Sequence, residues 1–532
     1  MNRRDHWKAP AEDGGVLVDP PLERAEELLD INHKRLEASK FTFLGRPLSE
    51  IRAQIQNSVA VVGDAGLAAL GSQRPHWPTA PIIASGHQPE FYHPGVWAKN
   101  FAVQGMAKRF GAAPLHVVID SDTLKTTVIE IPIWGSEPER VKIESVAYDS
   151  WKGEEPLLGR PVRDLALFRG FAKQVQEKCA GWPFEPWVSK IWPEAIQAHD
   201  RLARRLTGKY DDDSPPTLAW CLTLPRLLLE HSWGCVNREQ WLCLLDRQAF
   251  IGQILGDLPR FHAIYNDCLA AYRRKYHRRS ASHPVPDLAS DSDFFEAPFW
   301  WLHANANRRE RLFVRSRMDR LDLRPGRNGR VITVPAKSPY VSPELAQLGV
   351  QLTTRALTTT MFLRLCVADL FIHGIGGAKY DDLTDDIIRR YFGIDPPEYM
   401  VVSGTLLLPF EDKLFPRFGC GTPRRKARDV LWNPQRYLEA DDPAARELAA
   451  EKQHWIEQKP ADSAGRRERF YQLQSLTLRL RKYVAELQQR AEEDLNRCEA
   501  EAAANKILTN REYAFVLYPE EKLRPFLTQF FK

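Results

Sequence analysis

Two short apolar runs on either side of a helical segment constrain the fold of this chain more than any other feature. Residues 81–86 (PIIASG) predict a buried strand that runs into a turn, and residues 115–120 (LHVVID) predict a second strand. The spacing of apolar residues between them, at 96–110, predicts a helix. Strand, loop, helix and strand in this order form the βαβ unit of a parallel sheet. We therefore expect an α/β fold with a parallel-sheet core.

The rest of the chain predicts helices around this core. Near the C-terminus, Leu473, Leu476, Leu480, Val484 and Leu487 recur at spacings of 3, 4, 4 and 3, which predicts a helical seam. Such a seam either pairs two helices of one chain or joins two chains in a dimer. The expected organisation is an N-terminal leader with helices at 1–74, a core at 75–150 and 291–410, a helical insertion at 151–290, and a C-terminal helical arm with a closing segment at 411–532.

Charge and composition argue against several classes of protein. The 532 residues carry 74 Lys and Arg against 69 Asp and Glu, a net charge of +5 that is too mild and too mixed to predict nucleic-acid binding. No uncharged apolar run reaches the roughly 18 residues of a membrane span, and the first residues lack the apolar stretch of a signal peptide. The eight cysteines stand singly, without zinc spacing. We expect a cytoplasmic protein with mostly buried thiols, and neither zinc, haem nor flavin.

The loop between the first predicted strand and the helix is rich in polar side chains. Glycine permits a tight turn beside a ligand, His87 and His93 can move protons near neutral pH, and the start of a helix favours anions. The pattern resembles the phosphate-binding loop of nucleotidyltransferases and class I synthetases, with Val96 in the place of the final histidine. A structural turn with two ordinary histidines is the alternative. The candidate residues of this loop are Gly86, His87, Gln88, His93, Lys99 and Asn100.

Two acids, Asp120 and Asp122, come directly after the second predicted strand. The carboxyl ends of parallel strands meet at one edge of the sheet, so these acids are expected beside the first loop. They are candidates for binding Mg²⁺, a ribose hydroxyl or a substrate amine. Helix capping and turn formation are the structural alternative.

A glycine-rich stretch at residues 371–386 predicts a second polar loop, whose backbone amides can face an anion. It lacks the Gly-Lys-Ser/Thr of a Walker loop and a clean GxGxxG pattern. We expect the active site to join residues 85–100 to residues 371–386. The candidates from this stretch are His373, Gly374, Gly376, Gly377, Lys379 and Asp381, with Arg355 upstream. Aromatic residues beside Glu296, together with Arg308 and Arg311, form either a substrate wall or a core anchor.

Four of these features together resemble the bacillithiol biosynthesis cysteine-adding enzymes, ligases that attach cysteine to glucosaminyl malate. Residues 85–88 (SGHQ) look like that family's TGQQ segment, 117–122 like its apolar strand ending in acids, 375–377 like its IGGPGE segment, and 510–518 like its closing segment. The resemblance implies a Rossmann-like core with helical insertions and a coiled-coil arm that makes homodimers. His87 stands where the family has glutamine, and residues 378–381 (AKYD) replace its PGE, so we expect a different acceptor pocket.

The expected function is therefore that of a ligase-like enzyme that joins or activates a small amino-acid or thiol-type substrate. ATP and Mg²⁺ are the expected cofactors, although no motif is diagnostic of ATP. A scaffold that has kept the fold without the chemistry, and a nucleotidyltransferase-like enzyme, are the alternatives. A small molecule and a second copy of the chain are the expected partners, with no nucleic acid and no membrane.

Overall fold

The computed structural model describes residues 7–62, 80–135, 137–207, 217–280, 284–303, 308–336, 343–416, 419–438 and 442–532. The chain is a mixed α/β protein that divides into two compact units. Unit 1 contains Met1–Glu130, Ser145–Leu407 and Arg511–Lys532, and unit 2 contains Ile131–Glu144 and Leu408–Asn510. Within the described ranges, every helix is too short or too polar to cross a lipid bilayer.

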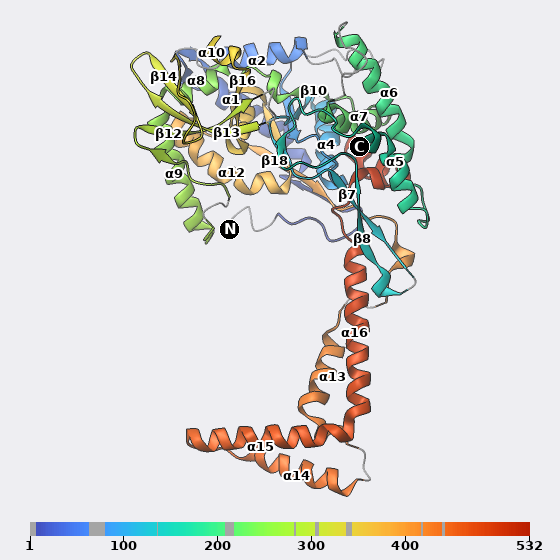
Figure 1. Cartoon of the computed structure of the whole chain (residues 1–532). Helices are drawn as coiled ribbons and strands as arrows, with labels where there is room; N and C mark the ends of the chain where they lie inside the picture. The colour runs from blue at the N-terminus through green and yellow to red at the C-terminus, as the bar shows by residue number, and fades with distance from the viewer. Residues whose placement is uncertain are drawn as a thin grey trace. The chain divides into compact units, whose positions relative to one another are not determined.

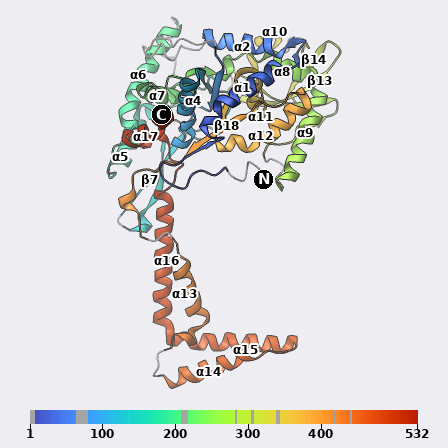
Figure 2. The same ribbon diagram turned by 180° about the vertical axis from the view of Figure 1, so that it is seen from behind.

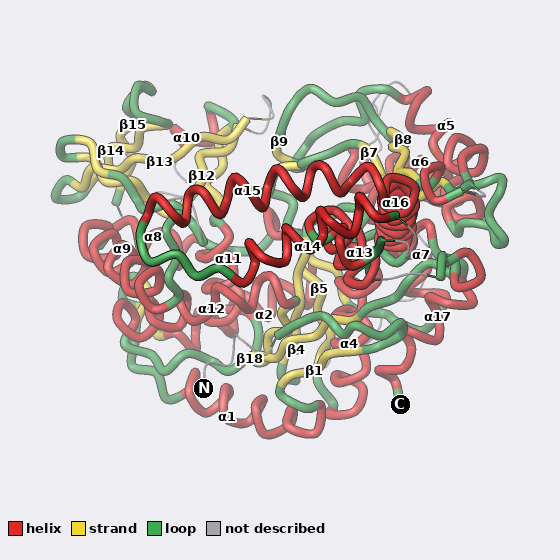
Figure 3. The backbone as a smooth tube through the Cα atoms, turned by 90° about the horizontal axis from the view of Figure 1, so that it is seen from below, coloured by secondary structure: helices red, strands yellow, loops and turns green. Residues whose placement is uncertain are grey.

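A six-stranded sheet forms the centre of unit 1 (Figure 3). Its inner strands are parallel, because each is followed by a crossover that returns to the same end of the sheet. Only β1 at one edge is antiparallel, and it pairs with β18. The order of the strands is β1 (Val16–Asp19), β18 (Tyr399–Gly404), β17 (Leu370–His373), β4 (Ile82–His87), β5 (Ala113–Val118) and β10 (Arg238–Trp241).

The crossovers change direction between β17 and β4. From β4 the chain passes through α4 (Pro94–Phe110) to β5 on one side, whereas from β17 it passes through α12 (Ile375–Ile387) to β18 on the other. Since such crossovers are right-handed, the two helices cover opposite faces of the sheet. Figure 2 shows α4 beside α17 (Glu520–Thr528), and α12 beside α9 (Leu258–Lys275). Ligands of open parallel sheets bind where the direction changes, outside the carboxyl ends of the strands.

An extensive apolar core lies on the α12 face. Sheet residues Ile82, Ala84, Leu115 and Val117 pack there with apolar residues of several helices. These helices are α2 (Leu48–Val62), α8 (Gln248–Gly256), α9, α11 (Ala356–Phe362) and α12. Alternate residues of β4 and β5 point to the same face, which explains the spacing of two in this set.

An antiparallel sheet occupies much of the region between residues 290 and 354, which the sequence predicts to be part of the core. Its strands β12, β13 and β14 lie together at one side of unit 1 in Figure 1. Strand β16 pairs with β12 and leads through Arg355 into α11, which connects this sheet to β17. The strands are β11 (Ser290–Asp291), β12 (Phe294–His303), β13 (Arg308–Ser316), β14 (Arg320–Pro325), β15 (Ile332–Pro335) and β16 (Val350–Thr354).

Helices dominate residues 151–280, as predicted: α5 (Leu165–Lys178), α6 (Val188–Thr207), α7 (Leu218–Ser232), α8 and α9. Strand β10 also lies in this region, and it joins the central sheet beside β5. At the N-terminus, the predicted leader contains the edge strand β1, and helices α1 (Ala25–Glu37) and α2 follow it. Residues 63–74 of that predicted segment lie outside the described residues.

Unit 2 consists mainly of paired helices (Figure 1). Helix α13 (Gly421–Trp432) packs on α16 (Ala485–Leu508), and α14 (Pro443–Glu457) packs on α15 (Ser463–Arg481). The predicted seam is partly buried within the unit, because Leu476 and Leu480 pack on Leu448 of α14. The predicted thiols are mostly buried: of the six free cysteines among the described residues, five are buried and Cys243 is partly exposed. Cys420 and Cys498 instead form a disulfide between the start of α13 and α16.

The closing segment returns to unit 1 and packs on α4. A Cβ atom placed on Gly105 of α4 would lie 2.0 Å from the carbonyl oxygen of Phe530, which is backbone and has no rotamer to move. Gly170, within α5, has as its nearest neighbour a side-chain nitrogen of Gln174, 3.5 Å from such a Cβ. Glycine destabilises the interior of a helix relative to alanine. The close contact with the C-terminal segment explains why this position of α4 is nevertheless glycine.

We predict that Gly105→Ala lowers the free energy of unfolding by about 1–3 kcal/mol, because the added methyl group overpacks the contact with Phe530. Gly170→Ala is the matched control and should raise the same quantity by about 0.5–1 kcal/mol, since alanine favours the helix. Urea denaturation of both variants measures the difference. A Gly105→Ala variant as stable as Gly170→Ala would show that the C-terminus does not pack on α4 in this way.

Candidate active site

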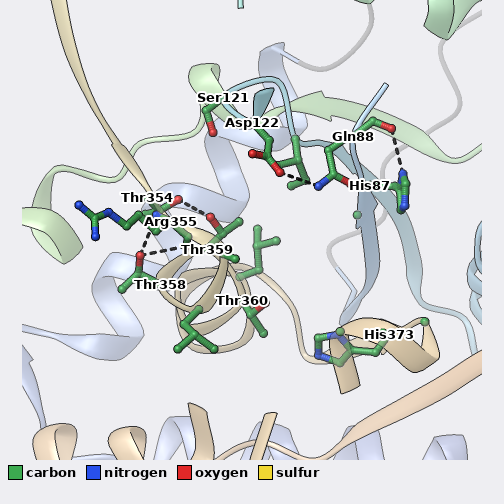
Figure 4. Close-up of a pocket in the computed structure, with 18 of the residues that line it drawn as sticks. His87, Gln88, Ser121, Asp122, Thr354, Arg355, Thr358, Thr359, Thr360 and His373 are labelled. Carbon is green, nitrogen blue, oxygen red and sulfur yellow. Dashed lines mark hydrogen bonds between the residues drawn. The ribbon is translucent and has the colours of Figure 1, made fainter. Parts of the chain in front are cut away.

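The two predicted polar stretches meet at the carboxyl ends of β4 and β17. A cavity of about 550 Å³ opens there, and both stretches line it. Figure 4 shows His87 and Gln88 on one part of its wall, Asp122 beside Gln88, and His373 below them. The predicted residues that line the cavity are Gly86, His87, Gln88, His93, Lys99, Asp122, Arg355, His373, Gly374, Gly376 and Gly377.

Four other predicted residues lie away from the cavity wall. Asn100 points into the protein, where its Nδ2 donates to Glu230 Oε1 at 2.6 Å. Asp120 is enclosed and accepts a hydrogen bond from the backbone N–H of Cys243 at 3.2 Å. Lys379 is exposed on α12, and Asp381 lies buried behind His373. Asn100 and Asp381 therefore act on the cavity only through the groups that they hold.

Lys99 brings a positive charge to a wall with little access to water. It projects from the second turn of α4, is 4% exposed, and donates from Nζ to the carbonyl oxygen of Gly86 at 3.0 Å. Burial lowers the pKa of Lys99 to about 8. The ammonium group is therefore charged at neutral pH but easily neutralised. An anion in the cavity would stabilise the charged form.

His87 and His93 are neutral at physiological pH. Burial, with the nearby charge of Lys99, lowers the pKa of His87 to about 3. Burial, Arg511 and Lys99 likewise lower the pKa of His93 to about 3. His93 also has a structural role, since its Nδ1 accepts from the backbone N–H of Gly95 and caps α4. Both rings can donate or accept hydrogen bonds, and neither supplies a positive charge.

His373 is the third histidine of the cavity, and it is held from several sides. Its Nε2 lies 2.5 Å from Asp381 Oδ2, and the rings of Phe371 and Tyr399 pack edge-on against it. Burial acts to raise the pKa of Asp381, but the charges of His373 and Arg364 outweigh burial and lower it. Asp381 is thus a buried carboxylate that fixes the orientation of the imidazole ring, as in other acid–base pairs.

The glycine-rich stretch is not the loop that we expected. Gly374 precedes α12, and Gly376 and Gly377 form its first turn. A Cβ atom on Gly377 would lie 2.9 Å from His373 Nδ1, whereas one on Gly376 would meet nothing within 4 Å. The free N–H groups of this turn, together with the +0.5 charge equivalent of a helix start, favour an anion.

Asp122 takes part in a contact between the two sheets. Its Oδ1 accepts from Arg309 Nη1 at 2.9 Å, and its Oδ2 accepts from Gln88 Nε2 at 2.8 Å. These partners lower the pKa of Asp122 against the opposing effect of burial. Both carboxylate oxygens therefore have protein donors, and Asp120 is enclosed beside Cys243. No group of three or more His, Cys, Asp or Glu side chains in the described ranges has the arrangement of a metal site.

Sequence reasoning missed several residues that line the cavity. Arg309 reaches it from β13, and Arg511 reaches it from the segment after unit 2. Neither has a local motif around it that would have identified it. The hydroxyl-rich run at residues 353–360 (TTRALTTT) was a visible signal, because Thr354, Thr358, Thr359 and Thr360 all line the cavity (Figure 4).

The cavity wall carries an excess of positive charge. In the described part of the chain, Asp122 is the acidic side chain that lines it, and Arg309 neutralises Asp122. The cationic side chains of the wall are Lys99, Arg309, Arg311, Arg355 and Arg511. A partly enclosed site whose wall has more cationic than acidic side chains attracts anions, because charges interact more strongly away from bulk water.

Comparison of the chain with models of known protein families gives no match, and comparison with curated proteins gives no significant match.

We predict that Gly377→Ala lowers the free energy of unfolding by about 1–3 kcal/mol, because its methyl group would push against a ring that cannot move. The control is Gly376→Ala, one residue earlier, which should be neutral or stabilising by up to about 1 kcal/mol. Thermal and urea unfolding measure both. Equal stability of the two variants would mean that His373 is not packed against α12.

Proposed function

We propose that this chain is an enzyme that binds a small anionic molecule in the cavity between its two sheets. The observation that carries the proposal is the cationic wall at the point where the crossovers change direction. Lys99 and the first turn of α12 approach each other there, since a Cβ on Gly374 would lie 3.8 Å from Lys99 Cδ. Phosphate and carboxylate groups are the anions that such a pairing of a cation with a helix start binds.

We further propose a ligase-like reaction that joins or activates a small amino-acid or thiol-type substrate. The resemblance to the cysteine-adding enzymes of bacillithiol synthesis motivates this step, and two histidines of the cavity wall support it chemically. His87 is neutral in the free protein and can form a hydrogen bond with a reacting group, and an anion bound beside it would raise its pKa from about 3 and make it a stronger base. His373 is held in place by Asp381, which would stabilise the imidazolium form during such a transfer.

The resemblance also motivates three structural proposals. These are a Rossmann-like classification of the core, a coiled-coil role for the arm, and a homodimer formed through it. The change of direction between β17 and β4 supports the first, and the paired helices of unit 2 support the second. A cytoplasmic location is proposed as well, and the redox state of the Cys420–Cys498 pair in cells would test it, because disulfides persist mainly in oxidising compartments.

ATP and Mg²⁺ remain part of the proposal. The carboxylates predicted to bind the metal are already engaged or enclosed, so Mg²⁺ would be held by the phosphates of the nucleotide, as it often is. When bound, the nucleotide would supply a phosphoryl or adenylyl group to activate a carboxylate. The protein's own part is to hold the anionic groups with Lys99 and the start of α12.

We predict that ATP with Mg²⁺, or another small phosphate or carboxylate, stabilises the protein against heat. A ligand present at about 100 times its Kd adds about 2.7 kcal/mol to the free energy of unfolding. Lys99→Met should abolish this shift. Lys452→Met is the matched control, because Lys452 is also a buried lysine, 3% exposed, but belongs to unit 2 and does not line the cavity.

The panel should contain ATP, ADP, AMP, CTP, inorganic phosphate, amino acids and thiols, each with and without Mg²⁺. If no anion shifts the melting temperature of the wild-type protein, the enzyme proposal fails and the scaffold alternative gains support. If ATP alone is inactive while other anions bind, only the nucleotide part of the proposal fails.

Anion binding should also weaken above about pH 8. Only the protonated form of Lys99 attracts an anion, and its pKa in the free protein is about 8. Below this pH the affinity should be constant, and above it the affinity should fall by up to about tenfold per pH unit, as proton linkage requires. His87 and His93 titrate near pH 3 and do not contribute in this range. Calorimetric titration from pH 7 to 9 measures the slope, which Lys99→Arg should remove.

A further inference from the structure

The cationic groups of the cavity lie at two separate ends. The proximal end, as we call it, consists of Lys99 and the first turn of α12, at the edge of the parallel sheet. The distal end consists of Trp300, Arg311 and Arg355, on the side of the antiparallel sheet. In Figure 4, Thr359 and Thr360 lie between Arg355 and the side of His87 and His373, and the guanidinium of Arg355 points away from that side. One small anion therefore cannot contact both ends.

The distal end carries its own excess of charge. Glu296 is fully buried and accepts from Arg355 Nη1 at 2.7 Å, while Arg311 Nη1 lies 3.5 Å from its other oxygen. A single carboxylate thus faces two guanidinium groups. The side chain of Arg311 is 50% exposed, so most of its donors remain open to a ligand.

Packing fixes the geometry of this end. The guanidinium of Arg355 lies 4.3 Å from the centre of the Trp300 ring, and that of Arg309 lies 4.4 Å from the same ring. Arg309 is neutralised by Asp122, which leaves Arg311 and Arg355 as the source of the excess. Guanidinium groups bind carboxylates and phosphates with two parallel hydrogen bonds, which makes them selective for such anions.

The proximal end is a second, independent excess. The hydrogen bond of Lys99 goes to a carbonyl oxygen rather than to a carboxylate. His87 and His93 beside it are neutral, so they do not add to the charge or compensate it. A ligand with one anionic group would leave either Lys99, which is 4% exposed, or Arg355, whose side chain is 14% exposed and which shares Glu296 with Arg311, without a counter-charge of its own. An uncompensated charge that has little access to water is unfavourable.

We propose that the molecule bound in this cavity carries two anionic groups, one for the proximal end and one for the distal end. Its class is that of small molecules with two carboxylates, two phosphates or one of each, separated by a spacer. This inference rests on the proposed function, since it requires that the cavity binds anions at all. Arg311 is then a specificity-determining residue, because it selects ligands that have the second anionic group.

The test compares anions that differ in number of charged groups and in spacer length. Calorimetric titration of the full-length protein with acetate, malonate, succinate, glutarate and adipate gives their relative affinities. At least one diacid should bind about tenfold or more tightly than acetate, the order expected for an added hydrogen-bonded charge pair. Phosphonoacetate and methylenediphosphonate have the spacer of malonate, and comparison with malonate shows whether either end prefers a phosphate-type group.

Two variants of β13 locate the second anionic group. Arg311→Gln should reduce the affinity for the best diacid to near that of acetate, and leave the affinity for acetate unchanged. Arg308→Gln is the control, because Arg308 lies on the same strand, is 65% exposed and does not line the cavity. It should change neither affinity.

Three results would overturn the inference while leaving anion binding intact. The diacids could bind no more tightly than acetate at every length, Arg311→Gln could weaken acetate and diacid equally, or Arg308→Gln could weaken the diacid as much as Arg311→Gln does. Failure of every anion to bind would instead reject the proposed function on which the inference rests.

Discussion

The parallel pairing of β17 with β4 is the contact on which the rest of the structure depends. Leu370 lies opposite Ile83 and Ile372 opposite Ser85, so two distant parts of the chain share one sheet. The register brings the ends of both strands to the same edge, where His87 and His373 emerge. Because the crossovers leave this pair in opposite directions, α4 and α12 do not cover that edge, and the space between their first turns remains open for a ligand.

A buried polar network beneath α4 holds one wall of this space. Glu230, on α7, accepts from Trp97 Nε1 and Asn100 Nδ2, both at 2.6 Å, and pairs with Arg226 at 2.7 Å. Removing one partner of such a network would leave an uncompensated charge in the interior, which costs about 3–5 kcal/mol. Asn100 therefore orients α4 from behind, and by doing so it fixes the side of the helix from which Lys99 reaches the cavity.

The sequence was most informative where a local apolar pattern determines the structure. The strands predicted near residues 81–86 and 115–120, and the helix between them, are confirmed as β4, β5 and α4, because buried runs and helical spacing are properties of the chain itself. The two ends of the cavity were less predictable. Arg309 and Arg511 arrive from separate strands and segments, and only the tertiary fold places them beside Lys99. The direction in which Asn100 points depends on the rotation of α4 against α7, which no single-sequence pattern encodes.

The glycines at the start of α12 also show that a sequence pattern does not reveal a tertiary contact. Three glycines within four residues predict a loop, since each costs a helix about 1 kcal/mol relative to alanine. They nevertheless lie at the start of a helix. Position 377 requires glycine there, because a side chain would collide with His373, whose ring is held by Asp381 further along the same helix. The glycine required by this contact also leaves backbone N–H groups uncovered at the cavity wall. Tight packing of the histidine and an open helix start are thus two consequences of one residue choice.

The order of the chain adds a final constraint on this site. The larger segment of unit 2, Leu408–Asn510, is inserted between Leu407 and Arg511, and the first residue after this insertion already lines the cavity. Arg511 donates toward Thr405 Oγ1 at 3.3 Å, so the two ends of the insertion lie close together within unit 1. The segment that follows packs on α4 through Phe515 and Phe530. The wall that carries Lys99 and His93 is therefore completed by Arg511, which comes from beyond the insertion.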